Sequence, residues 1–371
     1  MSLKIFHTSD LHLGMKFSRY PEVQQELSES RFSTLKSLVE QASRGGCQLF
    51  VVAGDLFDRV SVAKRDVLRA ATIMKEFAGN AIAVLPGNHD FVSRGQLDLW
   101  SSFKENMPDH LVFLEEERVY SLRHYDLDAD LYAAPCHSKH SAVNAVGWIK
   151  GIEKDRTVTH HIGVAHGSLE GVSPDFDGAY YPMNEAELMQ FGADVWVLGH
   201  THIQYPSKPG LRNRVFFAGT PEPDGFDCQH SGSAWLIELR DDKTINAVSI
   251  STGSHRFLYE IAEVRSAEDL DHLRRRLEDK EHAEDLLKLR LKGSLSRVEY
   301  SDLTALRAWA EEHFLYCELD YTDVAEKIEM DAIETEFAGG SFPHRLLTML
   351  SEAGDSEGLK IAYEMICEVR K

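Results

Sequence analysis

Short apolar runs alternate with amphipathic stretches through the first 90 residues. The apolar runs predict strands at residues 4–10, 47–55 and 81–90, each ending in turn-forming or polar residues. Between them, residues 26–43 and 62–79 show the amphipathic pattern of helices. Short strands that are apolar throughout and are separated by helices are typical of an α/β fold whose sheet is covered on both faces.

Further apolar runs follow, with fewer and shorter helices between them. They predict strands at residues 131–136, 160–166, 194–200, 214–220 and 233–239. This later portion is typical of a second sheet packed on the first. The predicted fold class is therefore α/β, a layered two-sheet sandwich flanked by helices.

The pattern changes near residue 255. Strands at 257–264, 287–295 and 316–324 alternate with helices at 267–287 and 300–314, which predicts a small α+β unit. Two further helical stretches, 344–353 and 357–370, end the sequence. We therefore predict three parts, namely residues 1–255, 256–340 and 341–371.

Composition restricts the class of protein. Of 371 residues, 43% are hydrophobic, which is enough for a folded core. No apolar run reaches membrane-spanning length and no N-terminal signal pattern is present, so we expect no membrane partner. The five cysteines are scattered without CxxC spacing, which predicts a reduced, cytoplasmic protein without a structural zinc site. The net charge of −20 argues against unaided binding to nucleic acid, although bound divalent cations would offset part of it locally.

Polar residues of metal-binding type follow five of the predicted strands. Each has an ordinary interpretation alone: Asp10 as a helix cap, Asp55 as a turn residue, His166 as a core histidine, and the pair His200 and His202 as surface residues. Together they are hard to explain by packing, because buried polar clusters need partners. The set consists of Asp10, His12, Asp55, Asn88, His89, Asp90, His166, His200 and His202.

The side-chain types restrict the metal. Imidazole, carboxylate and one amide oxygen, with no thiolate, suit divalent ions such as Mn²⁺, Fe²⁺ or Zn²⁺. Seven metal-ligand candidates are too many for one open site, and they fit two ions about 3.5–4 Å apart that share one carboxylate.

The ordered motifs D-x-H, G-D-x-x-D, G-N-H-D, a single H and G-H-x-H resemble those of the calcineurin-like binuclear metallophosphoesterases. The stretches "DLHLG", "GDLFD" and "GTPEPDGFD" are similar to DNA-repair nucleases of the SbcD type, which work with an SMC-like coiled-coil ATPase. The resemblance implies one metal on Asp10, His12, Asp55 and His202, and a second on Asp55, Asn88, His166 and His200. Mn²⁺ is the expected metal, with Fe²⁺, Zn²⁺ and Mg²⁺ left open.

The resemblance also implies catalytic roles for two residues that are not ligands. His89 would sit over the substrate phosphate, and Asp90 would orient the ring of His89. Some archaeal relatives carry a histidine where this chain has Asp58, so the role of that position is open here.

The expected reaction is hydrolysis of a phosphodiester by a hydroxide that two metals activate near neutral pH. DNA is the expected substrate, which would make the protein a metal-dependent exo- or endonuclease. A small-molecule phosphodiesterase or a phosphoprotein phosphatase would use the same centre. Basic residues near the site would either contact phosphates or form an ordinary solvated surface. Arg65 and Arg69 lie one helical turn apart in this group. The group consists of Lys16, Arg19, Arg59, Lys64, Arg65, Arg69 and Arg94.

The domains acquire expected roles through the same resemblance. Residues 1–255 would be the nuclease domain and 256–340 a capping domain beside the active site. Apolar residues at helical spacing in 341–371, such as Leu359, Met365 and Val369, would either pack on the local core or dock an SMC-like ATPase. No P-loop is present, so ATP hydrolysis would come from that partner. A homodimer is also compatible with the resemblance.

Overall fold

The computed structural model describes residues 2–93, 98–175, 177–278 and 283–369. The chain divides into two compact units, Met1–Phe257 and Leu258–Lys371. The predicted parts 1–255, 256–340 and 341–371 stay a prediction about folding and functional units. In the described residues, no helix is long and apolar enough to cross a membrane.

The first sheet of the first unit has six strands in the order β11-β10-β1-β2-β3-β4. Its parallel part comprises β1 (Ser2–Thr8), β2 (Leu49–Ala53), β3 (Ala81–Leu85) and β4 (Leu111–Phe113). Strand β10 (Ser233–Arg240) returns antiparallel to β1, and β11 (Ile245–Ser251) pairs with β10. The intervening helices are α1 (Gln24–Arg44), α2 (Lys64–Met74) and α3 (Asp98–Lys104).

The second sheet has five strands in the order β5-β6-β7-β8-β9. They are β5 (Val119–Ser121), β6 (Ala129–Ala134), β7 (His160–His166), β8 (Val195–Gly199) and β9 (Val215–Phe217). Strands β6 to β9 are parallel to one another, and β5 is antiparallel to β6. Helix α4 (Glu185–Phe191) and a short 3₁₀ turn at Gly147–Ile149 accompany this sheet.

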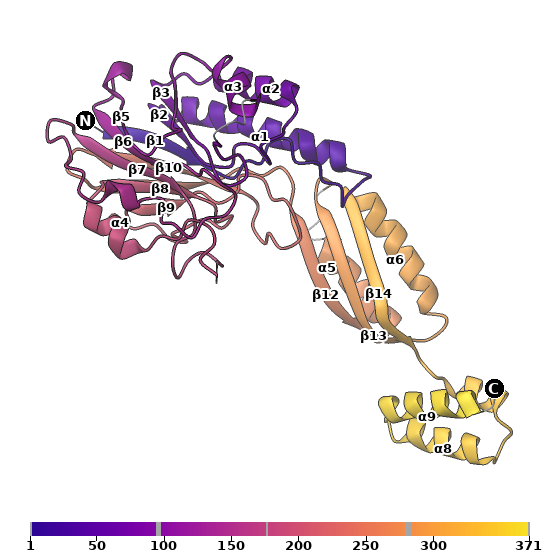
Figure 1. Cartoon of the computed structure of the whole chain (residues 1–371). Coiled ribbons are helices and arrows are strands. Elements are labelled where there is room, and N and C mark those ends of the chain that lie inside the picture. Colours follow the sequence, from indigo (N-terminus) through magenta and orange to yellow (C-terminus); the bar gives the residue numbers. More distant parts are fainter. Residues whose placement is uncertain (1, 94–97, 176, 279–282, 370–371) are drawn as a thin grey trace. The chain divides into compact units, whose positions relative to one another are not determined.

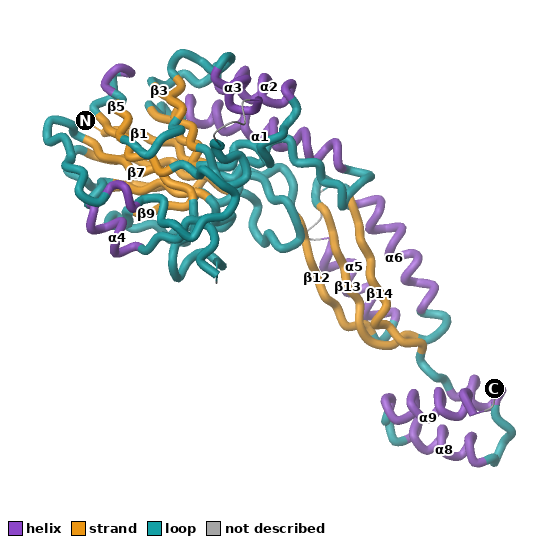
Figure 2. Tube along the Cα trace, viewed as in Figure 1, coloured by secondary structure: helices purple, strands orange, loops and turns teal. Residues whose placement is uncertain are grey.

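Three apolar cores separate the layers of this unit, and they explain why its central strands are apolar on both faces. Phe6 and Phe50 pack against helices α1 and α2. Ile5 and Val51, on the opposite face of the same strands, meet residues of the second sheet such as Val164. The outer face of the second sheet forms the third core with α4. Figures 1 and 2 show the strands lying between α1, α2 and α3 on one side and α4 on the other. The predicted two-sheet α/β sandwich is therefore confirmed.

The second unit begins with a three-stranded sheet in the order β12-β13-β14. Its elements are β12 (Phe257–Val264), α5 (Ala267–Glu278), β13 (Leu286–Leu295), α6 (Tyr300–His313) and β14 (Tyr316–Glu326). Leucines of α5 and β13 share one core with α6. The helix predicted over 267–287 is too long, because β13 starts at Leu286, and residues 279–282 lie outside the described residues.

The last elements are α7 (Met330–Glu336), α8 (Phe342–Glu352) and α9 (Ser356–Val369), of which α7 was not predicted. Ile333 and Phe337 join Leu347 and Leu359 in a small core that is distinct from the core of the three-stranded sheet. The final residue of the predicted helix 357–370 lies outside the described residues. The three helices thus pack on one another and not into the core of the sheet.

Candidate metal centre

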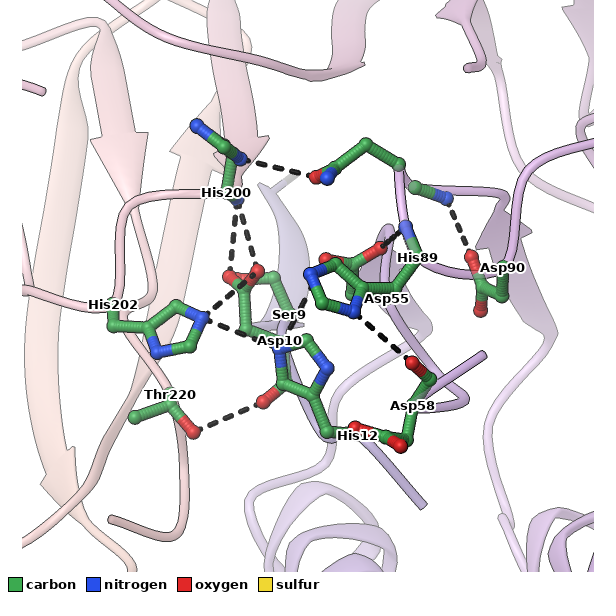
Figure 3. Close-up of polar contacts among 12 residues, drawn as sticks. Ser9, Asp10, His12, Asp55, Asp58, His89, Asp90, His200, His202 and Thr220 are labelled. Carbon is green, nitrogen blue, oxygen red and sulfur yellow. Dashed lines mark hydrogen bonds and ion pairs between the residues drawn. The ribbon is translucent and has the colours of Figure 1, made fainter. Parts of the chain in front are cut away.

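The metal-ligand candidates lie at the carboxyl ends of strands in both sheets. Asp10 and His12 follow β1, Asp55 follows β2, and Asn88 follows β3. In the second sheet, His166 is the last residue of β7, while His200 and His202 follow β8. Figure 3 shows His200 and His202 on one stretch of chain, facing Asp10, His12 and Asp55 on others. The structure therefore brings all seven predicted ligands together at the seam of the two sheets.

Where the two sheets meet, several ligand residues have left-handed backbone conformations, which direct their side chains toward one another. Asp10, His12 and Asp55 have φ values of 54°, 47° and 52°, a left-handed conformation that non-glycine residues seldom adopt. The amide of Asp10 donates to the carbonyl of Gly54 at 3.1 Å, and the amide of His12 donates to the carbonyl of Asp55 at 3.0 Å. Gly54 has a φ of 92°, and a Cβ there would lie 2.0 Å from Nδ1 of His166. The glycine of the G-D-x-x-D motif is thus needed for close approach of the second sheet.

One group of ligand atoms surrounds His12. Its Nε2 lies 3.2 Å from Nε2 of His202 and 3.9 Å from Oδ2 of Asp55. Nε2 of His202 lies 3.9 Å from Oδ1 of Asp10. Ligand atoms of Asp10, His12 and His202 are close enough to hold a cation together. This is the first ligand set that the resemblance implied, apart from the shared Asp55.

A second group surrounds Asn88. Its Oδ1 lies 2.9 Å from Nε2 of His166 and 3.1 Å from Nδ1 of His200. Nε2 of His166 lies 3.3 Å from Oδ2 of Asp55. Oδ2 of Asp55 therefore approaches one histidine of each group. It lies 3.3 Å from Nε2 of His166 and 3.9 Å from Nε2 of His12. This position fits a shared ligand between two ions.

The electrostatics of the cluster fit a cation. Although burial raises it, the pKa of Asp55 lies below the ordinary value because His166, His12 and His89 surround the carboxylate. Burial lowers the pKa of His166, but Asp55 and Asp10 outweigh burial and raise it to about 9. Burial and neighbouring His166 lower the pKa of His200 to about 3. The carboxylates thus favour a positive charge at this position, which a bound divalent ion would supply.

His89 lies beside the cluster, and its role on the substrate stays a prediction. Its ring lies edge-on to that of His12, with 4.8 Å between ring centroids, and its amide donates to Oδ1 of Asp55 at 2.8 Å. Nδ1 of His89 lies 3.0 Å from the main-chain carbonyl of Asp58, so this nitrogen donates the hydrogen bond. The side chain of Asp58 instead accepts from Arg59. Position 58 therefore orients His89 through its backbone, which any residue can supply.

Asp90 has a different place from the one expected. Its buried carboxylate accepts from the amide of Gly87 at 2.7 Å and from the amide of Phe57 at 2.9 Å. Burial and the charge of Asp55 raise its pKa to about 8. The expectation that Asp90 orients the ring of His89 is corrected by these contacts, since the carbonyl of Asp58 does so. Asp90 instead fixes the two loops that carry Asp55 and Asn88.

Three further residues support the centre and were not singled out from the sequence. Thr220 donates to the carbonyl of Asp10 at 2.9 Å. The carboxylate of Asp224 lies 3.5 Å from Nδ1 of His202, and the buried side chain of Arg31 donates to the carbonyl of Leu11 at 2.6 Å. Thr220 and Asp224 both lie within the "GTPEPDGFD" stretch, whose likeness to SbcD-type nucleases was the sequence signal that could have indicated them. Nothing in the sequence around Arg31 distinguishes it from other arginines of amphipathic helices.

The basic residues near the site are partly paired with acids. Arg69 binds Glu29 at 2.7 Å and lies over the ring of Phe32, and Arg65 lies 3.4 Å from Asp66. These side chains nevertheless line a cavity of about 770 Å³ together with Lys16 and Arg59. Arg94 lies outside the described residues.

Comparison with known proteins decides the family. The family model described as calcineurin-like phosphoesterase matches residues 3–204, which is more than half of the chain. The chain is a calcineurin-like phosphoesterase. This family uses a binuclear divalent-metal centre, and the two ligand groups around His12 and Asn88 fit such a centre.

Individual relatives of this calcineurin-like phosphoesterase are distant. The uncharacterized metallophosphoesterase YhaO of Bacillus subtilis is 27% identical over 319 residues, covering 79% of this chain and 69% of the relative. The DNA double-strand break repair protein Mre11 of Methanopyrus kandleri is 22% identical over 253 residues, covering 65% of this chain and 51% of the relative. The crystal structure of the calcineurin-like phosphoesterase YfkN from Bacillus subtilis aligns with 15% identity and a TM-score of 0.41, covering 68% of this chain and 91% of that one.

Proposed function

We propose that this phosphoesterase hydrolyses DNA phosphodiesters, as a repair nuclease of the SbcD type. The observation that carries the proposal is the cluster of ligands at the seam of the sheets, with His89 beside it. Bound divalent ions would supply Lewis acidity toward the phosphate and an ionised water. Mn²⁺ is the metal we expect, since imidazole and carboxylate ligands suit it.

The residues of the chain would position and protonate the substrate. Because Nδ1 of His89 donates to the carbonyl of Asp58, Nε2 is the ring nitrogen left to meet a phosphate. A protonated Nε2 can donate to a phosphoryl oxygen or to the leaving alkoxide. The backbone contacts of His89 with Asp55 and Asp58 hold the ring in place for either role.

Two observations support DNA as the substrate class. The archaeal relative is a DNA double-strand break repair protein, although this chain spans about half of its length. The cavity lined by Lys16, Arg59, Arg65 and Arg69 offers cations for phosphates, and the side chain of Arg65 is 88% exposed. Glu29 and Asp66 line the same cavity and reduce its positive charge, so the metals must contribute to phosphate binding.

A substrate panel tests the proposal. The purified protein is supplied with Mn²⁺ or Mg²⁺ and incubated with end-labelled duplex DNA, single-stranded DNA, a cyclic nucleotide and a phosphopeptide. We expect metal-dependent degradation of DNA, and Asp55→Asn serves as the matched inactive variant. Turnover of the cyclic nucleotide or phosphopeptide, with DNA left intact, would replace the proposal by one of the two alternative functions.

We further propose that the helices α7 to α9 dock an SMC-like coiled-coil ATPase. Leu359 is buried in their shared core, but Phe342, Met349 and Met365 are 75%, 66% and 62% exposed. Exposed apolar side chains on a small helical cluster are typical of a docking surface. We expect Met349→Ser combined with Met365→Ser to abolish co-purification of such an ATPase, while the exposed neighbour Glu364→Ser retains it. Retention by the double variant would place docking elsewhere.

A further inference from the structure

Asp224 lies behind the metal-ligand candidate His202. Nε2 of His202 faces His12 and Asp10, while Nδ1 on the other side of the ring lies 3.5 Å from Oδ2 of Asp224. The second oxygen of Asp224 accepts from the thiol of Cys228 at 3.2 Å. A carboxylate close to the far nitrogen of a histidine favours a proton on that nitrogen, and leaves the other nitrogen free to bind a metal.

The guanidinium of Arg31 lies between Asp224 and the turn that carries Asp10 and His12. The side chain of Arg31 is fully buried, and one terminal nitrogen donates to the carbonyl of Leu11 at 2.6 Å. The other lies 3.3 Å from the carbonyl of Glu222 and 3.9 Å from Oδ2 of Asp224. Leu11 separates Asp10 from His12 in the sequence. The guanidinium of Arg31 therefore contacts both the turn that carries these two ligands and the loop that carries Asp224.

A buried arginine is a poor choice for stability alone. Removing a guanidinium from water is costly, and apolar replacements of buried ion pairs are often neutral or stabilising. Nε of Arg31 has no hydrogen-bond partner among the described residues, so its burial is not fully compensated. The geometry of the planar guanidinium, which reaches Leu11 and Glu222 at once, is what an apolar side chain would lack.

We propose that Asp224 and Arg31 are positioning residues for one of the two metals, the ion assigned to Asp10, His12, Asp55 and His202. Asp224 holds the imidazole of His202 with Nε2 toward the ion. Arg31 holds Asp224 and, through the carbonyl of Leu11, the turn that presents Asp10 and His12. The inference rests on the binuclear centre and is independent of DNA as the substrate.

Calorimetric titration of the metal-free protein with Mn²⁺ tests the proposal without any activity assay. We expect two binding events for the unchanged protein. Asp224→Asn should weaken one of them by about 10- to 100-fold, the range typical of partners that orient metal-bound histidines, and leave the other unchanged. Asp224→Glu should restore part of the affinity. Asp227→Asn is the matched control, since this exposed carboxylate lies in the same loop and should change neither event.

Further variants identify the affected site and the role of Arg31. In the His12→Ala background, which should already lack the same site, Asp224→Asn should cause no further loss. Arg31→Met should weaken the same event, and the loss in the double variant with Asp224→Asn should be smaller than the sum of the two single losses, because Arg31 acts in part through Asp224. Thermal unfolding of each metal-free variant shows whether it folds; if Arg31→Met does not, the Asp224 variants alone decide.

Several results would overturn the proposal. Equal weakening of both Mn²⁺ events by Asp224→Asn would indicate a general structural role. Unchanged affinity would show that His202 needs no such support. A third binding event for Zn²⁺ that disappears in Cys228→Ser would instead make His202, Asp224 and Cys228 a separate metal site, since their ligand atoms are close enough to hold an ion. Each outcome leaves the question of DNA hydrolysis open.

Discussion

His7 should make the stability of the first unit depend on pH between about 6.5 and 4. The ring is buried in β1, and Nε2 lies 3.1 Å from the carbonyl of Leu198 and 3.2 Å from that of Phe216, in strands of the other sheet. Nε2 must therefore carry a hydrogen, while buried Nδ1 has no partner among the described residues. Burial lowers the pKa of His7 to about 4, and the contacts with the two carbonyls oppose this only in part.

The size of the effect follows from the two pKa values. Above pH 6.5 the ring is neutral in both the folded and the unfolded chain, so its titration contributes nothing to the pH dependence. As the pH falls below 6.5, His7 binds a proton in the unfolded chain but stays neutral in the folded chain down to about pH 4. The folded state therefore loses stability. Between about pH 7.5 and pH 5 the loss from this one group is about 2 kcal/mol.

The variant His7→Gln isolates this contribution. Glutamine can donate to the carbonyls of Leu198 and Phe216 but does not titrate. Urea unfolding of the metal-free protein at pH 7.5 and pH 5 can be followed by tryptophan fluorescence, since four of the five tryptophans lie in Met1–Phe257. The unchanged protein should lose about 2 kcal/mol more than the variant over this range. Parallel losses in the two proteins would show that His7 is not held neutral by its surroundings.

Three further predictions concern the metal centre and the division of the chain. Asp55→Asn should lower the content of both metals, measured by elemental analysis, whereas His12→Ala should mainly affect one; two metals per chain in Asp55→Asn would refute the shared ligand. His89→Ala should keep its metals but lower turnover by on the order of 10²-fold, and loss of metal would contradict a role on the substrate. A chain of residues 1–256 should still hydrolyse bis(p-nitrophenyl) phosphate but degrade DNA poorly, and undiminished DNA cleavage would argue against a capping role for residues 257–340.

The elements that could be predicted are those whose apolar residues form a continuous run or recur at helical spacing. Strands such as Leu49–Ala53 and Ala81–Leu85 are apolar at every position, so the sequence pattern reveals them directly. Strand Ile245–Ser251 was not predicted, because four of its seven residues are exposed and its apolar residues form no continuous run; its pairing with β10 makes it a strand. The short strand Leu111–Phe113 and the helix Met330–Glu336 are defined in the same way by tertiary packing.

Some features of the site could likewise be predicted from the sequence, and others could not. The seven metal-ligand candidates follow predicted strands, and parallel strands bring their carboxyl ends to one edge, so their convergence could be predicted. The role of Asp90 could not, because a carboxylate can accept from any nearby donor, and the choice of Gly87 and Phe57 depends on loop geometry. The approach of Arg31 to Asp224 joins residues that are far apart in the sequence, and neither residue type reveals burial.

Ligands drawn from both sheets also determine when, during synthesis, the centre can first bind its ions. Asp10 leaves the ribosome early, but His202 follows it by 192 positions in the sequence. At about 5–20 residues per second, the nascent chain carries an incomplete ligand set for on the order of 10 to 40 s. The complete ligand set can therefore assemble only after the second sheet has formed. A divalent ion at 100 times its dissociation constant would then add about 2.7 kcal/mol to the stability of the finished unit, by holding together two sheets that were made at different times.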